Sequence, residues 1–176
     1  MKKTKLRADF DWQMVVSEDA DQGKLGKGLS ARMLFQIYLI NAFERSIIDL
    51  KADDCVNGPI HLSIGQEAIA SAAMAALTDS DRIAGSHRAH HQFLAKALNH
   101  VLPGKWDPTR DDLGDAGREV VRRTLAEIMG LSPGYCGGRG GSMHLRWEEA
   151  GVLGTNAIVA GGVPLSTGAA YAEKFR

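Results

Sequence analysis

The stretch Gly134-Tyr135-Cys136-Gly137-Gly138-Arg139-Gly140-Gly141-Ser142-Met143-His144 gathers five glycines around one arginine and closes on Ser-Met-His. Glycine inside a helix or strand costs roughly 0.5 to 1 kcal/mol relative to alanine, so such a cluster indicates backbone that adopts positive φ or is approached closely by another group. The cluster therefore predicts part of a functional site. A flexible surface connection is the alternative interpretation.

Composition narrows the class of protein only loosely. A chain of 176 residues with 44% hydrophobic and 24% charged residues is typical of one globular domain. Lysine plus arginine balances aspartate plus glutamate at 21 each, and no segment has the 18 or so apolar residues of a membrane span. Two cysteines do not make a disulfide framework. We therefore expect a cytoplasmic protein with no nucleic-acid and no membrane partner.

The pattern of apolar residues and punctuating residues predicts a helix-rich domain after a polar arm. The arm is expected at residues 1–29 and the domain at residues 30–176. Ser30 and Asp115 are predicted to cap helices, and Gly130 to end one. Helices are expected over residues 31–51, 68–77, 92–98, 115–129 and 164–175, and short strands over residues 83–84 and 158–160. Helices joined to short buried strands indicate the α/β class.

A histidine-rich segment, Gly85-Ser86-His87-Arg88-Ala89-His90-His91, follows the first expected strand. On a helix, its three histidines would share one face and could bind zinc with help from His61, His144 or Cys136. No familiar zinc-ligand spacing accompanies them. Recognition of an anion by the forked guanidinium of Arg88 is the favoured interpretation, and histidines that only satisfy loop carbonyls are a third possibility.

Three further polar residues admit structural interpretations. His61 and His144 are each either structural or proton-transfer groups, because a histidine titrates near neutral pH. Glu67 begins an expected helix, where a carboxylate stabilises the helix dipole, and we favour that structural role.

Four segments in order resemble one known family. They are residues 61–68 (His-Leu-Ser-Ile-Gly-Gln-Glu-Ala), 86–90 (Ser-His-Arg-Ala-His), 137–145 (Gly-Gly-Arg-Gly-Gly-Ser-Met-His-Leu) and 158–165. Together they resemble the α subunit of thiamine-diphosphate-dependent 2-oxo acid dehydrogenases, of the pyruvate and acetoin dehydrogenase type. The resemblance covers roughly residues 30–176. It implies the N-terminal part of a thiamine-diphosphate-binding fold, helix-rich with short parallel strands.

The resemblance also implies two catalytic residues. The histidine before the Gly-Gln-Glu-Ala helix lines the substrate pocket in the family, which makes His61 the residue that contacts the substrate. The Ser-Met-His tripeptide approaches the active site, which makes His144 a second proton-transfer candidate.

By the same resemblance, five residues are expected to bind the cofactor. Arg88 would contact the diphosphate, and His87 stands where the family commonly has tyrosine. Ala157 and Val159 would hold the aminopyrimidine ring through main-chain groups, and Ser142 would approach the cofactor.

The resemblance implies thiamine diphosphate and Mg²⁺ as cofactors. The family's Gly-Asp-Gly metal motif would follow the last expected helix, so no metal ligand is expected among these 176 residues. The segment Gly114-Asp115-Ala116-Gly117 resembles this Gly-Asp-Gly motif in sequence, but no apolar strand precedes it. The implied substrate is a small 2-oxo acid or acetoin, and the acyl group passes to a lipoyl group. The implied partners are a β subunit, in an α2β2 assembly, and a lipoyl-bearing acyltransferase.

Three other functions remain open on the sequence alone. The chain could be a non-catalytic fragment that needs a complementing chain, and we expect it by itself to bind the cofactor weakly and to turn nothing over. It could be a zinc-dependent enzyme that uses His87, His90 and His91. It could also be a generic phosphate-binding α/β domain.

Overall fold

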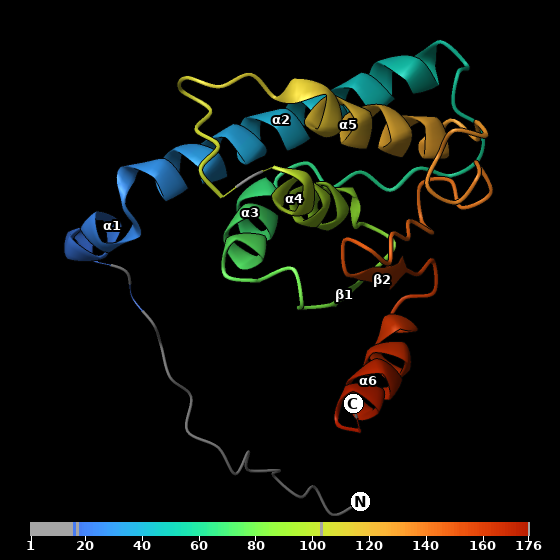
Figure 1. Cartoon of the computed structure of the whole chain (residues 1–176). Coiled ribbons are helices and arrows are strands. Elements are labelled where there is room, and N and C mark those ends of the chain that lie inside the picture. Colours follow the sequence, from blue (N-terminus) through green and yellow to red (C-terminus); the bar gives the residue numbers. More distant parts are fainter. Residues whose placement is uncertain (1–15, 17, 103, 176) are drawn as a thin grey trace, which may run out of the picture.

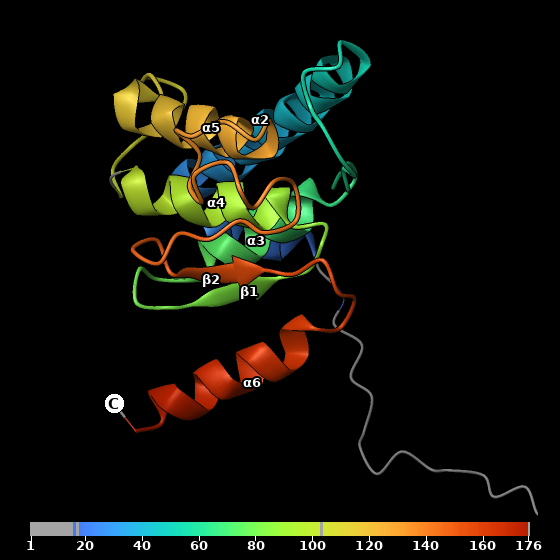
Figure 2. The same ribbon diagram turned by 90° about the vertical axis from the view of Figure 1, so that its right-hand side faces the viewer.

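The computed structural model describes residue 16, residues 18–102 and residues 104–175. The elements are α1 (Asp19–Leu25), α2 (Lys27–Ala52), α3 (Glu67–Ala75), β1 (Ile83–Gly85), α4 (His90–Val101), α5 (Gly114–Ile128), β2 (Val152–Thr155) and α6 (Gly162–Glu173). Figure 1 shows the long helix α2 and α5 above α3 and α4. Figure 2 shows the strand pair beneath α4, with α6 on the far side of the strands.

Helix α4 forms the centre of the core. Eight of its residues are buried, including Phe93, Leu94 and Leu98, because other elements cover it on several sides. Ile40 and Ile47 of α2 are fully buried with them. Each such side chain stabilises the fold by about 1.5–3 kcal/mol through removal of apolar surface from water. A helix buried in this way fixes the position of whatever precedes it, and the histidine-rich segment lies directly before and at its first turn.

The two strands are parallel, and they bring two distant segments to one edge. Ile83 pairs with Val152 and Gly85 with Thr155, with an irregularity in the register after Ile83. Parallel strands need a long crossover connection, and here α4, α5 and the glycine-rich loop provide it. Because the carboxyl ends of parallel strands lie at the same edge, the residues that follow β1 and those that follow β2 meet there.

Most of the expected architecture is confirmed, with corrections at the element ends. The helix-rich α/β class with short parallel strands is observed. The prediction that Ser30 caps a helix is wrong: α2 begins at Lys27, and the Ser30 hydroxyl donates to the Gly26 carbonyl inside the first turn. Asp115 likewise lies in the first turn of α5, whose N-cap is Leu113.

The prediction of a strand at residues 158–160 is wrong. The β1 edge pairs with Val152–Thr155 instead. Residues 158–160 form a turn in which Ile158 donates its N–H to the Asn156 side chain and Ala160 adopts φ 64°. Ile158 is 71% exposed, so the apolar triplet is a surface feature of this chain.

The predicted arm at residues 1–29 lies partly outside the described residues, at 1–15 and 17. Its described part contains α1 and the first residues of α2, and the boundary at residue 30 stays a prediction. None of the described helices combines the length and apolarity that crossing a bilayer requires.

Gly130 ends α5 as predicted and supports the glycine-rich loop. It adopts φ 75°, its N–H donates to the Glu127 carbonyl, and the Leu131 N–H donates to the Ala126 carbonyl. This is the Schellman arrangement of a helix C-terminus. Gly138 packs directly on it: a Cβ at Gly138 would lie 2.6 Å from the carbonyl carbon of Gly130.

Gly138→Ala is expected to destabilise the chain more than Gly137→Ala. Both glycines have positive φ, 75° and 67°, but a Cβ at Gly137 meets nothing within 4 Å. Backbone strain alone costs about 1 kcal/mol, and Gly138→Ala adds the clash with Gly130. Urea unfolding of both variants measures the difference. Equal free energies of unfolding would contradict the packing described here.

Candidate active site

The glycine-rich loop is folded around a buried carboxylate. Glu127, in the last turn of α5, is 0% exposed. One of its oxygens accepts the N–H groups of Cys136 (2.6 Å) and Gly138 (2.9 Å), and the other accepts those of Gly140 (2.6 Å) and Gly141 (3.3 Å). A carboxylate is a pure acceptor, and hydrogen bonds to it are stronger than neutral ones. The loop thus surrounds an anion that belongs to the protein itself.

Gly134, at the start of this loop, lies so close to the Glu127 main chain that a side chain does not fit there. A Cβ at Gly134 would lie 2.6 Å from the Glu127 Cα. The role of Glu127 was not predicted from the sequence. A signal was present, because Val120, Thr124 and Glu127 share the buried face of α5 and a carboxylate on such a face needs donors. The adjacent loop supplies them.

A second buried carboxylate, Glu44 of α2, was also missed. Glu44 and His90 are both 0% exposed, and the His90 Nδ1 lies 3.1 Å and 3.3 Å from the two Glu44 carboxylate oxygens. The His90 Nε2 lies 2.9 Å from both the carbonyl oxygen and the hydroxyl oxygen of Ser142. This line of contacts joins α2, the start of α4 and the end of the glycine-rich loop.

His61, His87 and Arg88 lie together at the carboxyl end of β1. The rings of His61 and His87 meet edge to face, with centroids 5.0 Å apart. Arg88 donates to the carbonyl of Leu62 at 2.6 Å, and the His61 N–H donates to the Ser142 hydroxyl at 3.3 Å. His61 therefore contacts both His87 and Ser142, and Arg88 contacts the residue that follows His61.

Ala157 and Val159 follow β2 at the same edge. The Asn156 N–H donates to the Gly85 carbonyl at 3.2 Å, which fixes the start of their turn beside the segment that leads to His87. Ala157 is half-buried and Val159 is 72% exposed.

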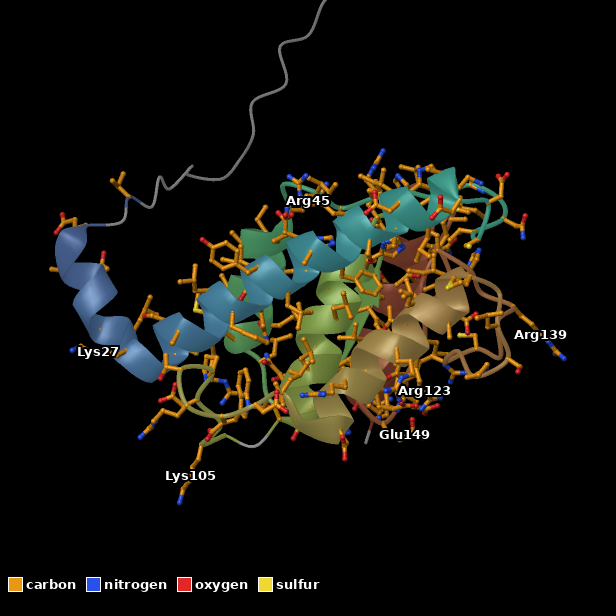
Figure 3. The ribbon with its side chains drawn as sticks, turned by 90° about the horizontal axis from the view of Figure 1, so that it is seen from above. Lys27, Arg45, Lys105, Arg123, Arg139 and Glu149 are labelled. Atoms are coloured by element: carbon orange, nitrogen blue, oxygen red, sulfur yellow. The ribbon has the colours of Figure 1, made fainter. Side chains whose placement is uncertain are left out.

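Among the described contacts, none joins His144 to His61. His144 is exposed and lines a cavity of about 690 Å³ between the glycine-rich loop, β2 and α6. Arg139 and Arg146 also line this cavity, and Figure 3 shows Arg139 extending outward from the loop. The Cys136 thiol donates to the His144 carbonyl, and burial raises its pKa, which disfavours a reactive thiolate.

The zinc hypothesis finds no support in this geometry. His87 precedes α4, so the three histidines do not share a helical face, and His90 is engaged by Glu44 and Ser142. Within residues 16, 18–102 and 104–175, no group of three or more His, Cys, Asp or Glu side chains is arranged to hold a metal ion.

The pKa values of His91, which follows His90 on α4, and of Glu67, which interacts with His91, are also shifted. Burial lowers the pKa of His91, which is 2% exposed and whose Nδ1 has no hydrogen-bond partner, although the nearby Glu44 opposes this shift. Burial acts to raise the pKa of Glu67, but hydrogen bonds from the Asn41 side chain and the Gly65 N–H outweigh it and lower this pKa. Glu67 is thus fully partnered in the first turn of α3, as its structural interpretation expects.

The fold and the site define part of an α/β domain whose ligand edge lies at the carboxyl ends of its parallel strands. Comparison with known families gives the finer class. The model of the dehydrogenase E1 component family matches residues 37–176, and the chain belongs to this family.

Curated relatives of the chain are named as α subunits of enzymes for acetoin or pyruvate. The chain is 35% identical over 137 residues to the α subunit of acetoin:2,6-dichlorophenolindophenol oxidoreductase of Bacillus subtilis, and 36% identical over 133 residues to that of Cupriavidus necator. It is 32% identical over 119 residues to the chloroplastic pyruvate dehydrogenase E1 component subunit alpha-3 of Arabidopsis thaliana. These matches cover 78%, 76% and 68% of this chain, but only 35%, 33% and 23% of the relatives.

Glu127→Gln is expected to destabilise the chain by about 2–4 kcal/mol. The amide keeps one acceptor and turns an NH₂ group toward loop N–H groups that then lose their partner. The matched control is Glu119→Gln on the same helix, whose exposed ion pair with Arg122 contributes less than about 1 kcal/mol. Urea unfolding measures both, and the Cys136 thiol should react faster with a thiol reagent in the Glu127 variant. Equal effects of the two substitutions would contradict the role of Glu127.

Stability is expected to fall as the pH drops below about 6.5, partly through His91. Its pKa is lowered in the folded chain, so the unfolded chain binds a proton first, and protonation favours unfolding in that window. Each pH unit there costs at most about 1.4 kcal/mol. Between pH 7.5 and pH 5, the free energy of unfolding should fall less for His91→Gln than for the original chain. His100→Gln on the same helix is the control, and an unchanged loss in the His91 variant would refute the assignment.

Proposed function

We propose that this chain supplies the cofactor-binding and substrate-binding edge of the α subunit of a thiamine-diphosphate-dependent dehydrogenase. The substrate would be a small 2-oxo acid or acetoin. The observation that carries the proposal is the shared edge itself: the segments after β1 and β2 bring His87 and Arg88 to the same side of the strand pair as Ala157 and Val159. The family and the names of the relatives support the same activity.

The residues at this edge fit an anionic cofactor. Arg88 is exposed, uses one donor on the Leu62 carbonyl, and forms no ion pair with any acidic side chain of the described residues. The His87 Nδ1 is buried and has no hydrogen-bond partner among the described residues. A guanidinium binds phosphate oxygens in a forked geometry. Arg88 would therefore contact the diphosphate, and His87 would face the cofactor beside it.

Thiamine diphosphate supplies a nucleophilic carbon and an electron sink for breaking the bond beside a carbonyl. In the proposal, the main-chain groups of Ala157 and Val159 orient the cofactor's aminopyrimidine ring. His61, held at its N–H by Ser142, contacts the substrate oxygen. Ser142 lies against the cofactor, and His144 is the second proton-transfer group.

Mg²⁺ belongs to the proposal only as an ion bound outside the described residues. Among the described residues, no group of three or more His, Cys, Asp or Glu side chains could hold a metal ion. We therefore assign no step to the metal.

Exposed apolar side chains support the proposed partners, a β subunit in an α2β2 assembly and a lipoyl-bearing acyltransferase. Helix α6 has no buried residue. Val163, Leu165, Tyr171 and Phe175 are 61–70% exposed, and Ile158 and Val159 in the turn before the helix are 71% and 72% exposed. Exposed apolar side chains gathered in one segment are typical of contact with further polypeptide. Both cysteines are free, which supports a reducing compartment such as the cytoplasm.

Enzyme assays after co-expression with the neighbouring reading frames test the proposal. Thiamine-diphosphate-dependent cleavage of acetoin or decarboxylation of a 2-oxo acid, followed with a dye as electron acceptor, is the expected result. A phosphate-binding domain of another kind would show no response to a partner subunit. The absence of activity with every 2-oxo acid and with acetoin, in an assembly that forms, would overturn the proposal.

Arg88→Gln is expected to weaken thiamine diphosphate binding about tenfold or more, because a charge-assisted contact to phosphate is lost. The matched control is Arg110→Gln. Arg110 is exposed and pairs with Asp107 in the loop between α4 and α5, so this variant should bind thiamine diphosphate normally. Titration calorimetry on the assembled protein measures both. Equal affinities of the two variants would remove Arg88 from the cofactor site.

A further inference from the structure

The main chain around His61 is fixed on both sides of the residue. The His61 N–H donates to the Ser142 hydroxyl at 3.3 Å, and the carbonyl of the next residue, Leu62, accepts a hydrogen bond from Arg88 at 2.6 Å. The His61 side chain is half-buried, so part of its ring stays open to a ligand. The remaining freedom of this histidine therefore lies in its side-chain torsions.

The ring of His87 limits those torsions. The centroids of the His61 and His87 rings are 5.0 Å apart and the two ring planes meet at 88°, so the edge of one ring meets the face of the other. An aromatic ring has a negative face and a positive edge, which favours this arrangement, and the contact is lost when one ring turns. The contact thus selects one orientation of the His61 ring.

His87 is itself held in place by the fold. It lies in the short turn between β1, which ends at Gly85, and α4, which begins at His90 in the buried core. Within this turn, the Arg88 N–H donates to the Ser86 hydroxyl at 3.2 Å. The Nδ1 of His87 is buried and has no hydrogen-bond partner among the described residues. The His87 ring is therefore positioned by packing.

We propose that His87 is a positioning residue whose ring holds the His61 ring in the orientation that contacts the substrate. The contact of His61 with substrate rests on the proposed function, whereas the orientation of its ring in the folded chain does not. In this role, His87 must supply an aromatic ring and not a hydrogen bond. The alternative role for His87 is a hydrogen bond from a ring nitrogen to the ligand.

Two substitutions separate these roles. His87→Phe keeps an aromatic ring but removes both ring nitrogens, whereas His87→Gln keeps a hydrogen-bonding group but removes the ring. The matched control is His100→Gln, in the last turn of α4. It removes an edge-to-face contact of the same kind, because the His100 ring meets that of Trp147 with centroids 5.3 Å apart and planes at 88°.

NMR of the chain without cofactor measures the orientation of the His61 side chain through the three-bond couplings about its Cα–Cβ bond. A single rotamer is expected in the original chain, in His87→Phe and in His100→Gln, and an average over rotamers in His87→Gln. A residue that served only the stability of the fold would change the free energy of unfolding and leave these couplings as they are. A single rotamer in His87→Gln would therefore overturn the proposal. So would an averaged rotamer in the original chain or in His87→Phe, even if His87→Gln failed to fold.

Kinetics of the assembled enzyme test the consequence for the substrate. We expect kcat/KM to be about threefold to tenfold higher in His87→Phe than in His87→Gln, because only the phenylalanine keeps the ring contact. The two variants should bind thiamine diphosphate equally in titration calorimetry, and His100→Gln should keep the original kcat/KM. Equal kcat/KM values in the two variants, or a higher value in His87→Gln, would refute the role of the ring. Because the NMR measurement needs no substrate or partner, failure of the proposed function would leave its result standing.

Discussion

The Glu127 carboxylate is the group on which the site's geometry depends. It lies in the last turn of α5, where the Schellman turn at Gly130 ends the helix. Its two oxygens accept four N–H groups of the following loop. Those contacts reverse the chain within a few residues and deliver Ser142 to His90. The Thr155 hydroxyl then ties the loop's exit to β2, since it donates to the Met143 carbonyl and accepts the Leu145 N–H.

The buried carboxylates of Glu127 and Glu44 therefore have different structural roles. A buried carboxylate without partners is strongly unfavourable. Glu127 meets this requirement with main-chain donors and so orders a loop, whereas Glu44 meets it with the His90 ring, which also contacts Ser142. The glycines of the loop serve the internal anion: they let the main chain approach Glu127 closely enough for its N–H groups to bind. The anion of a ligand is left to Arg88, at the strand edge.

The sequence predicted the parts of the fold that depend on local pattern. The apolar pattern of α2 and the stop of α5 at Gly130 are local signals, and both helices were found within a few residues of where they were expected. Strand β2 was missed because Val152-Leu153-Gly154-Thr155 contains a glycine and is less apolar than Ile158-Val159-Ala160. Pairing with β1 decides between the two segments, and that contact joins Ile83 to Val152, 69 positions further along the chain. The roles of Glu44 and Glu127 were missed for the same reason, because their partners lie elsewhere in the sequence.

Amide hydrogen exchange at Gly138 and Gly140 tests the central claim most directly. If the loop is folded around Glu127, these two N–H groups are hydrogen-bonded in the native state and exchange only when the end of α5 opens. This arrangement predicts protection similar to that of the last turn of α5, and greater than that of Gly137, whose φ is also positive but whose N–H donates to the Gly134 carbonyl within the loop and not to the buried carboxylate. Exchange of Gly138 and Gly140 at the rate of an unprotected loop would contradict it.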